Sequence, residues 1–161
     1  MHTDALGSAL PDLFSELVDG APLTEAYMTN RGDAGLLRSL DRLSATAASK
    51  LTANGSSIAA HVDHLRYGLS LMNRWAAGEN PFDDANWTLS WRKTRVTAAE
   101  WKKLREDLAG ESHRWLKALR IGREIGDSEL KGVIGSIAHL AYHVGAIRQI
   151  DHSARGPSAN D

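Results

Sequence analysis

The chain has 161 residues, which is the length of a single domain, and 42% of them are hydrophobic, enough for a buried core. With 19 basic and 20 acidic residues the formal net charge is −1, so neither nucleic acid nor an anionic membrane is an expected partner. The sequence contains no cysteine, which excludes disulfides, thiolate catalysis and cysteine-based metal sites. A metal ion must therefore be bound by His, Asp or Glu.

The sequence also lacks the features of a membrane or secreted protein. None of its apolar stretches reaches the roughly 18 residues of a membrane span. The first residues, Met1–Leu6, lack the basic segment followed by an apolar segment that marks a secretory signal. We therefore expect a cytoplasmic protein without a membrane partner.

Apolar residues recur at helical spacing through almost the whole chain. The pattern predicts helices over residues 8–19, 34–49, 97–121 and 129–152, and one more from a cap at Ser56 or Ser57 to residue 77. Residues 78–96 form the one long connection. This predicts an all-α fold, an antiparallel four-helix bundle with an additional short N-terminal helix. Residues 1–152 are the expected single domain, and residues 153–161 the expected flexible C-terminal tail.

Two of these helices carry long apolar seams with steps of three and four residues. The seam of the 57–77 helix and that of the 129–152 helix consist of Ile58, Val62, Leu65, Leu69, Met72 and Ala76, and of Val133, Ile137, Leu140, Val144 and Ile147. Such seams are typical of helices that face a core. Asp33 is the expected N-cap of the 34–49 helix, and Thr97 with Glu100 forms a capping box at the best-marked helix start.

Four of the seven histidines lie on the two helices with these seams. His139 and His143 are four residues apart and project from one face of the last helix, so their imidazoles can converge on one cation. A divalent ion such as zinc, nickel or iron(II) needs at least one more nitrogen or oxygen ligand. His64 lies on the corresponding flank of its own seam, where it lines the crevice between neighbouring helices.

The identity of the third ligand stays open on helical geometry alone. His61 lies nearer than His64 to the middle of the apolar arc, and a core histidine needs only a hydrogen-bond partner. His61 is therefore an alternative ligand or a residue that hydrogen-bonds to a ligand. Asp63 points away from the same arc, so we expect it to face water. His113, on the 97–121 helix, lies beside the apolar seam of that helix and is not an expected ligand.

Three segments resemble the DinB-like superfamily of metal-binding four-helix-bundle proteins. Ser57–Leu65 resembles the second core helix of that family, Ala138–Gly145 resembles its final-helix motif, and Trp91–Trp101 is similar to the stretch that leads into a family helix. The likeness covers most of residues 33–152. One departure is Ala146, because many relatives carry Gln at that position, three residues after the last ligand histidine.

The resemblance implies a set of metal ligands. In the family, one histidine of the earlier helix and two of the last helix bind a divalent metal. The position before Leu65 is the ligand position of the family, so the likeness implies His64, together with His139 and His143. We expect zinc or nickel in this site. Catalytic residues other than the ligands stay unassigned.

The likeness implies two enzymatic functions. One is a thiol-dependent S-transferase, in which the metal activates a low-molecular-weight thiol toward a small electrophile, and the other is a metal-assisted hydrolase of a small substrate. The transferase suits a site without a resident general base, because the metal itself lowers the pKa of the thiol. His139 is followed by Leu140, so the pair is not the His-Glu-x-x-His of metalloproteases.

A non-enzymatic function is the third interpretation. It is a dimeric bundle with a structural or vestigial metal site, and many relatives are homodimers. The apolar seams of the two N-terminal helices are the expected dimer face. Trp87 and Trp91, in the long connection, either pin that loop to the helices or cover the metal crevice and shape a substrate pocket.

Overall fold

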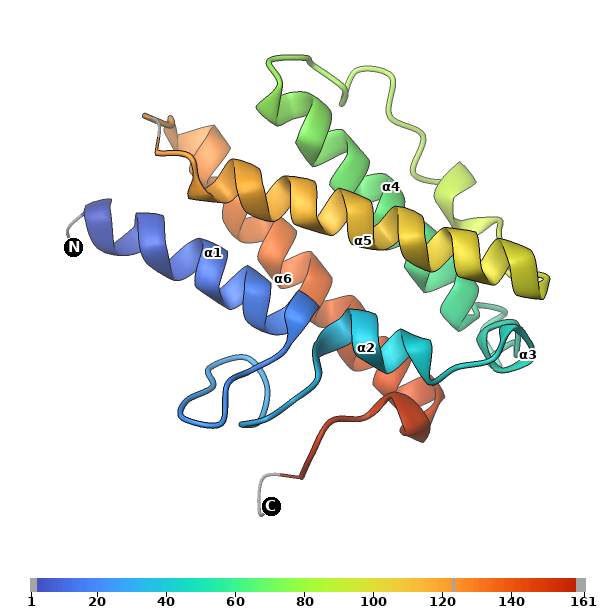
Figure 1. Cartoon of the computed structure of the whole chain (residues 1–161). Helices are drawn as coiled ribbons and strands as arrows, with labels where there is room; N and C mark the ends of the chain where they lie inside the picture. The colour runs from blue at the N-terminus through green and yellow to red at the C-terminus, as the bar shows by residue number, and fades with distance from the viewer. Residues whose placement is uncertain (1–2, 123, 159–161) are drawn as a thin grey trace.

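The computed structural model describes residues 3–122 and 124–158 (Figure 1). Every regular element in those residues is helical, which confirms the predicted all-α class. The elements are α1 (Thr3–Asp19), α2 (Gly35–Asp41), α3 (Ala45–Ala48), α4 (Ile58–Ala76), α5 (Ala98–Arg120), α6 (Asp127–Ile150) and the 3-10 turns η1 (Leu89–Trp91) and η2 (His152–Ala154). Among the described residues, no helix is both long enough and apolar enough to cross a membrane.

The four long helices pack around one core. Both α1 and α4 contact α5 and α6, and α5 lies in front of α4 and α6 in Figure 1. The predicted seam residues of α4 and α6 are buried in this core, apart from the partly buried Ala76. Burial of these apolar side chains is the main force that holds α4 against α6, the two helices with the candidate metal ligands.

Two of the predicted helix starts, those of α4 and α5, are confirmed by side-chain caps. Thr97 caps α5: its Oγ1 accepts the backbone N–H of Glu100, and the Glu100 carboxylate accepts the backbone N–H of Thr97 at 2.7 Å. Ser57 is the cap of α4, and its Oγ accepts the backbone N–H of Ala60. The Ser57 hydroxyl also donates to the carbonyl of Thr94 at 2.8 Å, which ties the start of α4 to the long loop.

The predicted helix over residues 34–49 is wrong in one respect, because it is two helices with a break between Asp41 and Ala45. Ser44 caps α3 by accepting the N–H of Ala47, so its side chain competes with a continued helix. The carbonyl of Leu43 accepts the indole N–H of Trp101 at 2.8 Å. In a continuous helix this carbonyl would accept the backbone N–H of Ala47, and here it accepts a side-chain N–H from α5 instead.

The first helix begins at Thr3, five residues before the predicted start, and contains Pro11. Proline removes one helical hydrogen bond, whose acceptor would be the carbonyl of Gly7. Gly7 is exposed, so water can satisfy that carbonyl and the helix continues. Much of the apolar seams of α1 and α2, including Phe14 and Leu36, is buried inside the chain, whereas Leu37 is partly buried.

Two glycines bring the end of α1 against the start of α2. Gly20 has φ +109° and Gly35 has φ +77°, conformations that L side chains rarely adopt. A Cβ atom on Gly35 would lie 2.4 Å from the backbone nitrogen of Gly20, so the contact requires glycine. Asp33 is not the N-cap that the sequence predicts, because α2 begins at Gly35 and its cap position is Ala34. The carboxylate of Asp33 accepts the N–H of Gly35 at 2.8 Å and pairs with Arg148 of α6 at 2.7 Å. This pair ties the loop to the helix that carries His139 and His143.

The chain after α6 contacts the loop between α1 and α2. Ala154 of η2 is fully buried, and the side-chain amide of Asn30 donates to the carbonyl of Pro157 at 2.7 Å. Residues 159–161 of the predicted tail, like residues 1–2 and 123 of the predicted domain, lie outside the described part of the chain.

The capping box of α5 leads to the first prediction. Thr97→Ala removes the side-chain oxygen that caps α5, so we expect the free energy of unfolding to fall by about 1 kcal/mol, measured by urea denaturation. Thr46→Ala is the matched control, because Thr46 is exposed within α3, and we expect it to change stability by less than about 0.5 kcal/mol. Equal effects of the two changes would contradict the capping role of Thr97.

Candidate metal centre

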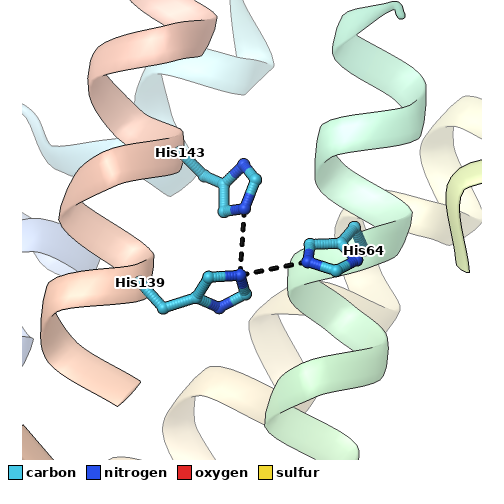
Figure 2. A group of neighbouring side chains, drawn as sticks. All are labelled: His64, His139 and His143. Atoms are coloured by element: carbon cyan, nitrogen blue, oxygen red, sulfur yellow. Dashed lines mark hydrogen bonds between the residues drawn. The ribbon is translucent and has the colours of Figure 1, made fainter. Parts of the chain in front are cut away.

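Three histidines from two helices converge in the space between α4 and α6. His64 projects from α4, and His139 and His143 project from α6 toward it (Figure 2). The Nε2 atom of His139 is 3.0 Å from Nε2 of His64 and 3.0 Å from Nε2 of His143. His64 and His143 are buried, and His139 is partly buried. The predicted third ligand is therefore placed beside the predicted pair.

The spacing of the three nitrogens fits a metal ion. Zinc binds imidazole nitrogen at about 2.0–2.1 Å, so two ligand nitrogens are about 3.0 Å apart at an N–Zn–N angle of about 95° and about 3.3 Å apart in a regular tetrahedron. The observed 3.0 Å separations lie at the narrow end of that range. One ligand atom from each histidine lies within 4.8 Å of the other two, so the group could hold a metal ion.

Hydrogen bonding alone does not satisfy this group. An imidazole nitrogen carries either one lone pair or one N–H, so it makes one strong hydrogen bond. Nε2 of His139 has two nitrogen neighbours at 3.0 Å, and only one of these contacts can be such a bond in any combination of neutral tautomers. A cation that accepts a lone pair from each ring removes the conflict, and the donor set therefore fits a metal ion.

Burial keeps these imidazoles neutral. It lowers the pKa of His64 to about 4, with the proximity of His139 and His61 acting in the same direction. Burial likewise lowers the pKa of His143 to about 3, again with a contribution from the neighbouring histidines. The pKa values of His61 and His139 are lowered by burial as well. A neutral imidazole is the form that binds a metal, so the site is ready for one at neutral pH.

The outer nitrogens of two of the three rings have hydrogen-bond partners. Nδ1 of His143 is 2.8 Å from Nδ1 of His61, and Nδ1 of His64 is 2.7 Å from Oγ of Ser90. His61 thus contacts the ring of His143 through the nitrogen that does not face the other two ligands. This placement favours an orienting role for His61 over the role of alternative ligand.

Aromatic rings cover the group from the side of the long loop. The ring of Trp91 stacks on His64 at a centroid distance of 4.3 Å and an interplanar angle of 25°, and it meets the edge of His61 at 5.1 Å. Trp87 lies 5.6 Å from His64, and Tyr142 of α6 lies 5.0 Å from His143. The two tryptophans therefore hold the loop directly against the candidate ligands.

The expectation that Asp63 faces water is wrong. Asp63 is only 7% exposed, and the guanidinium of Arg66 pairs with it at 2.9 Å. Both η1 and α3 contact α4, so tertiary packing buries more of this helix than its apolar seam alone predicts. All residues from Ile58 to Leu65 are buried.

Other candidates lie away from the group. His113 is exposed and its Nε2 pairs with the carboxylate of Asp19 at 2.8 Å, which links α5 to the end of α1. Gln149, one turn beyond Ala146, accepts a hydrogen bond from Arg155 at 3.2 Å.

Ser90, whose Oγ lies 2.7 Å from Nδ1 of His64, is the site residue that the sequence analysis did not predict. Its only signal was its position between two tryptophans in the long loop.

Comparison of the chain with family models, with curated proteins and with solved structures gives no match. Membership of the DinB-like superfamily therefore stays a prediction that rests on the segments Ser57–Leu65 and Ala138–Gly145. The fold and the site define the class of this protein without that resemblance: an all-helical protein with a three-histidine candidate metal centre.

The geometry predicts different effects for the two neighbouring histidines of α4. His64→Ala removes one of the three candidate ligands, so we expect the zinc content of protein purified without a His-tag to fall below about a tenth of the wild-type value. His61→Ala removes only a partner of His143, so we expect zinc affinity to fall by about tenfold to hundredfold. Metal analysis and chelator competition measure the two effects.

His113→Ala is the control for this comparison, because His113 is exposed and pairs with Asp19. We expect it to keep wild-type zinc binding. A loss from His61→Ala as large as the loss from His64→Ala would mean that His61 is itself a ligand.

The low pKa values predict how the stability of the metal-free protein depends on pH. The unfolded protein protonates these histidines at pH about 6.5, whereas the folded protein protonates His64 at about 4 and His143 at about 3. The free energy of unfolding is therefore unaffected by protonation of these two groups above pH 6.5 and falls as the pH decreases toward their pKa values in the folded protein. The loss is up to about 1.4 kcal/mol per pH unit for each histidine.

Urea denaturation in the presence of EDTA, between pH 7.5 and 5, measures this loss in a range where ordinary carboxylates stay ionised. His143→Gln removes one of the titrating groups, so its free energy of unfolding should fall less steeply with decreasing pH. Parallel pH profiles for the variant and the wild type would contradict the prediction.

Proposed function

We propose that this protein binds one divalent transition metal ion, zinc or nickel, through His64, His139 and His143. We propose further that it is a metal- and thiol-dependent S-transferase that acts on small electrophiles. The observation that carries the proposal is the convergence of three neutral imidazoles, two of them buried and one partly buried, in a group that includes no carboxylate. When bound by three neutral ligands, a divalent metal keeps its charge and open coordination positions, at which it lowers the pKa of a thiol.

The side chains around the group favour thiol transfer over hydrolysis. A hydrolase needs a group that takes a proton from the attacking water. Within residues 3–122 and 124–158, the hydrogen-bond and ring partners of the three ligands are Ser90, His61, Trp87, Trp91 and Tyr142. The carboxylate of Asp63 is paired with Arg66. Of these partners, His61 is the one with a basic nitrogen near neutral pH, and burial lowers its pKa. A thiol substrate relies less on a resident base.

The thiol must come from outside the chain, which contains no cysteine. The proposed reaction joins a thiol R–SH to an electrophile R′–X and yields R–S–R′ and HX. The carbon–sulfur bond forms as the carbon–X bond breaks, and the proton of the thiol leaves with X. The chain's own residues hold the ligand rings, exclude water from their buried faces and position the two substrates.

The rim of the site suggests the kind of electrophile. Trp87 is 41% exposed and contacts His64, and Tyr142 is 70% exposed and contacts His143. Aromatic rings that are open to solvent beside the ligands favour a small molecule with an apolar or aromatic body. The two tryptophans of the loop then both pin the loop and shape the substrate site.

We also propose that α1, α4, α5 and α6 form the antiparallel four-helix bundle of the DinB-like superfamily. The support is that α1 and α4 each pack against both α5 and α6, and that the ligands come from facing helices, as in other metal sites of bundles. The same likeness suggests a cytoplasmic homodimer, whose mass light scattering after gel filtration would measure.

The proposed activity predicts metal-dependent thiol conjugation. Protein purified without a His-tag and loaded with zinc or nickel should conjugate a chromogenic aryl chloride to at least one of a panel of low-molecular-weight thiols. We expect the rate to vanish in EDTA and in His139→Ala, because each removes the metal centre, and to persist in His113→Ala. Absorbance of the thioether product measures the rate.

The two alternatives give different results in the same assay. A metal-loaded protein that hydrolyses small esters and ignores every thiol would replace the transferase with a hydrolase. A metal-loaded protein that is inactive with both substrates, and whose stability falls when the metal is removed, would show a structural site.

A further inference from the structure

Ser90 contacts the outer nitrogen of His64. It belongs to η1, in the loop between α4 and α5, and is 5% exposed. Its Oγ lies 2.7 Å from Nδ1 of His64 and 2.7 Å from the carbonyl oxygen of Trp87. The contact is therefore made by the nitrogen of the His64 ring that does not face His139.

These two contacts determine which atoms carry the protons. A carbonyl oxygen only accepts hydrogen bonds, so the single hydroxyl proton of Ser90 is donated to Trp87. The oxygen of Ser90 then faces His64 with a lone pair, and Nδ1 of His64 must be the donor. Because a neutral imidazole has one N–H, Nε2 of His64 is left with a lone pair that points at His139.

We infer that Ser90 is a positioning residue for the metal centre, which holds His64 in the Nδ1–H tautomer by accepting its proton in a hydrogen bond. The inference rests on the proposed metal-binding function and extends it to the loop between α4 and α5. Trp91, the next residue, stacks on the same ring at 4.3 Å, so two neighbouring residues of η1 set both the tautomer and the plane of His64.

Removal of the Ser90 hydroxyl should weaken metal binding through the tautomer. In Ser90→Ala, Nδ1 of His64 has lost its acceptor, and the alternative Nε2–H tautomer places a proton where the metal binds. Loss of such a partner typically lowers metal affinity by about tenfold to hundredfold, and we expect a loss in that range. Ser90→Thr keeps the hydroxyl, and we expect it to recover most of the affinity.

Ser39→Ala is the matched control. Ser39 is also buried, and its hydroxyl donates to a backbone carbonyl, that of Gly35, at 2.7 Å. Its removal costs one similar hydrogen bond without a contact to any histidine, so we expect zinc affinity and the tautomer of His64 to stay as in the wild type. A general loss of stability would affect both serine variants, whereas a tautomer effect is confined to Ser90→Ala.

The test combines two measurements. Long-range ¹H–¹⁵N NMR correlations on metal-free protein at a pH of about 7.5, where His64 is neutral because burial lowers its pKa, report which nitrogen of His64 carries the proton. We expect Nδ1–H in the wild type, in Ser90→Thr and in Ser39→Ala, and a shift toward Nε2–H in Ser90→Ala. Chelator competition with zinc then measures the affinity of each variant.

Two results would overturn the role of Ser90. One is a wild-type His64 in the Nε2–H form, and the other is an unchanged tautomer and zinc affinity in Ser90→Ala. A wild-type protein that binds neither zinc nor nickel would instead refute the proposed function. The NMR measurement needs no metal, so it decides whether Ser90 holds the tautomer in that case as well.

Discussion

The burial of polar imidazoles between two apolar helix faces is the constraint on which the rest of this structure depends. A buried polar group without a hydrogen-bond partner costs about 1–3 kcal/mol. Four histidines share the space between α4 and α6. Their ring nitrogens lie within hydrogen-bond distance of one another and, for His64, of the hydroxyl of Ser90. The seams of α4 and α6 hold the helices at the distance at which these contacts form.

The same burial explains the electrostatic character of the site. Protonation would place positive charges beside one another in a region shielded from water, and the pKa values of His64 and His143 are lowered to about 4 and about 3 for that reason. The metal-free site is therefore a cluster of neutral bases with crowded lone pairs. At neutral pH these imidazoles do not take up a further proton, and their lone pairs are therefore free to bind a divalent cation.

The long loop between α4 and α5 is part of the site as well as a connection. It places Ser90 against the outer nitrogen of His64 and Trp91 against the face of the same ring. The loop is itself anchored, since Ser57 donates to Thr94 and the N–H of Asn86 donates to the hydroxyl of Tyr67 at 2.8 Å. Changes in loop conformation are therefore coupled to the orientation of a candidate ligand.

Much of the molecule was predictable from local sequence signals. The helix class, the two seams, the capping box at Thr97 and the pairing of His139 with His143 all follow from the regular 100° turn per residue of a helix and from caps within four residues. Such relations hold inside one helix and need no knowledge of its neighbours.

The relations between helices were decided by the tertiary structure alone. Helical geometry left His61 and His64 as rival ligands, because the choice depends on the rotation and axial offset of α4 against α6, which the packing of the whole core sets. The burial of Asp63, the break before Ser44 and the contact of Ser90 with His64 depend likewise on segments far apart in the sequence. Sequence periodicity determines which face of a helix is apolar, and only packing determines what that face meets.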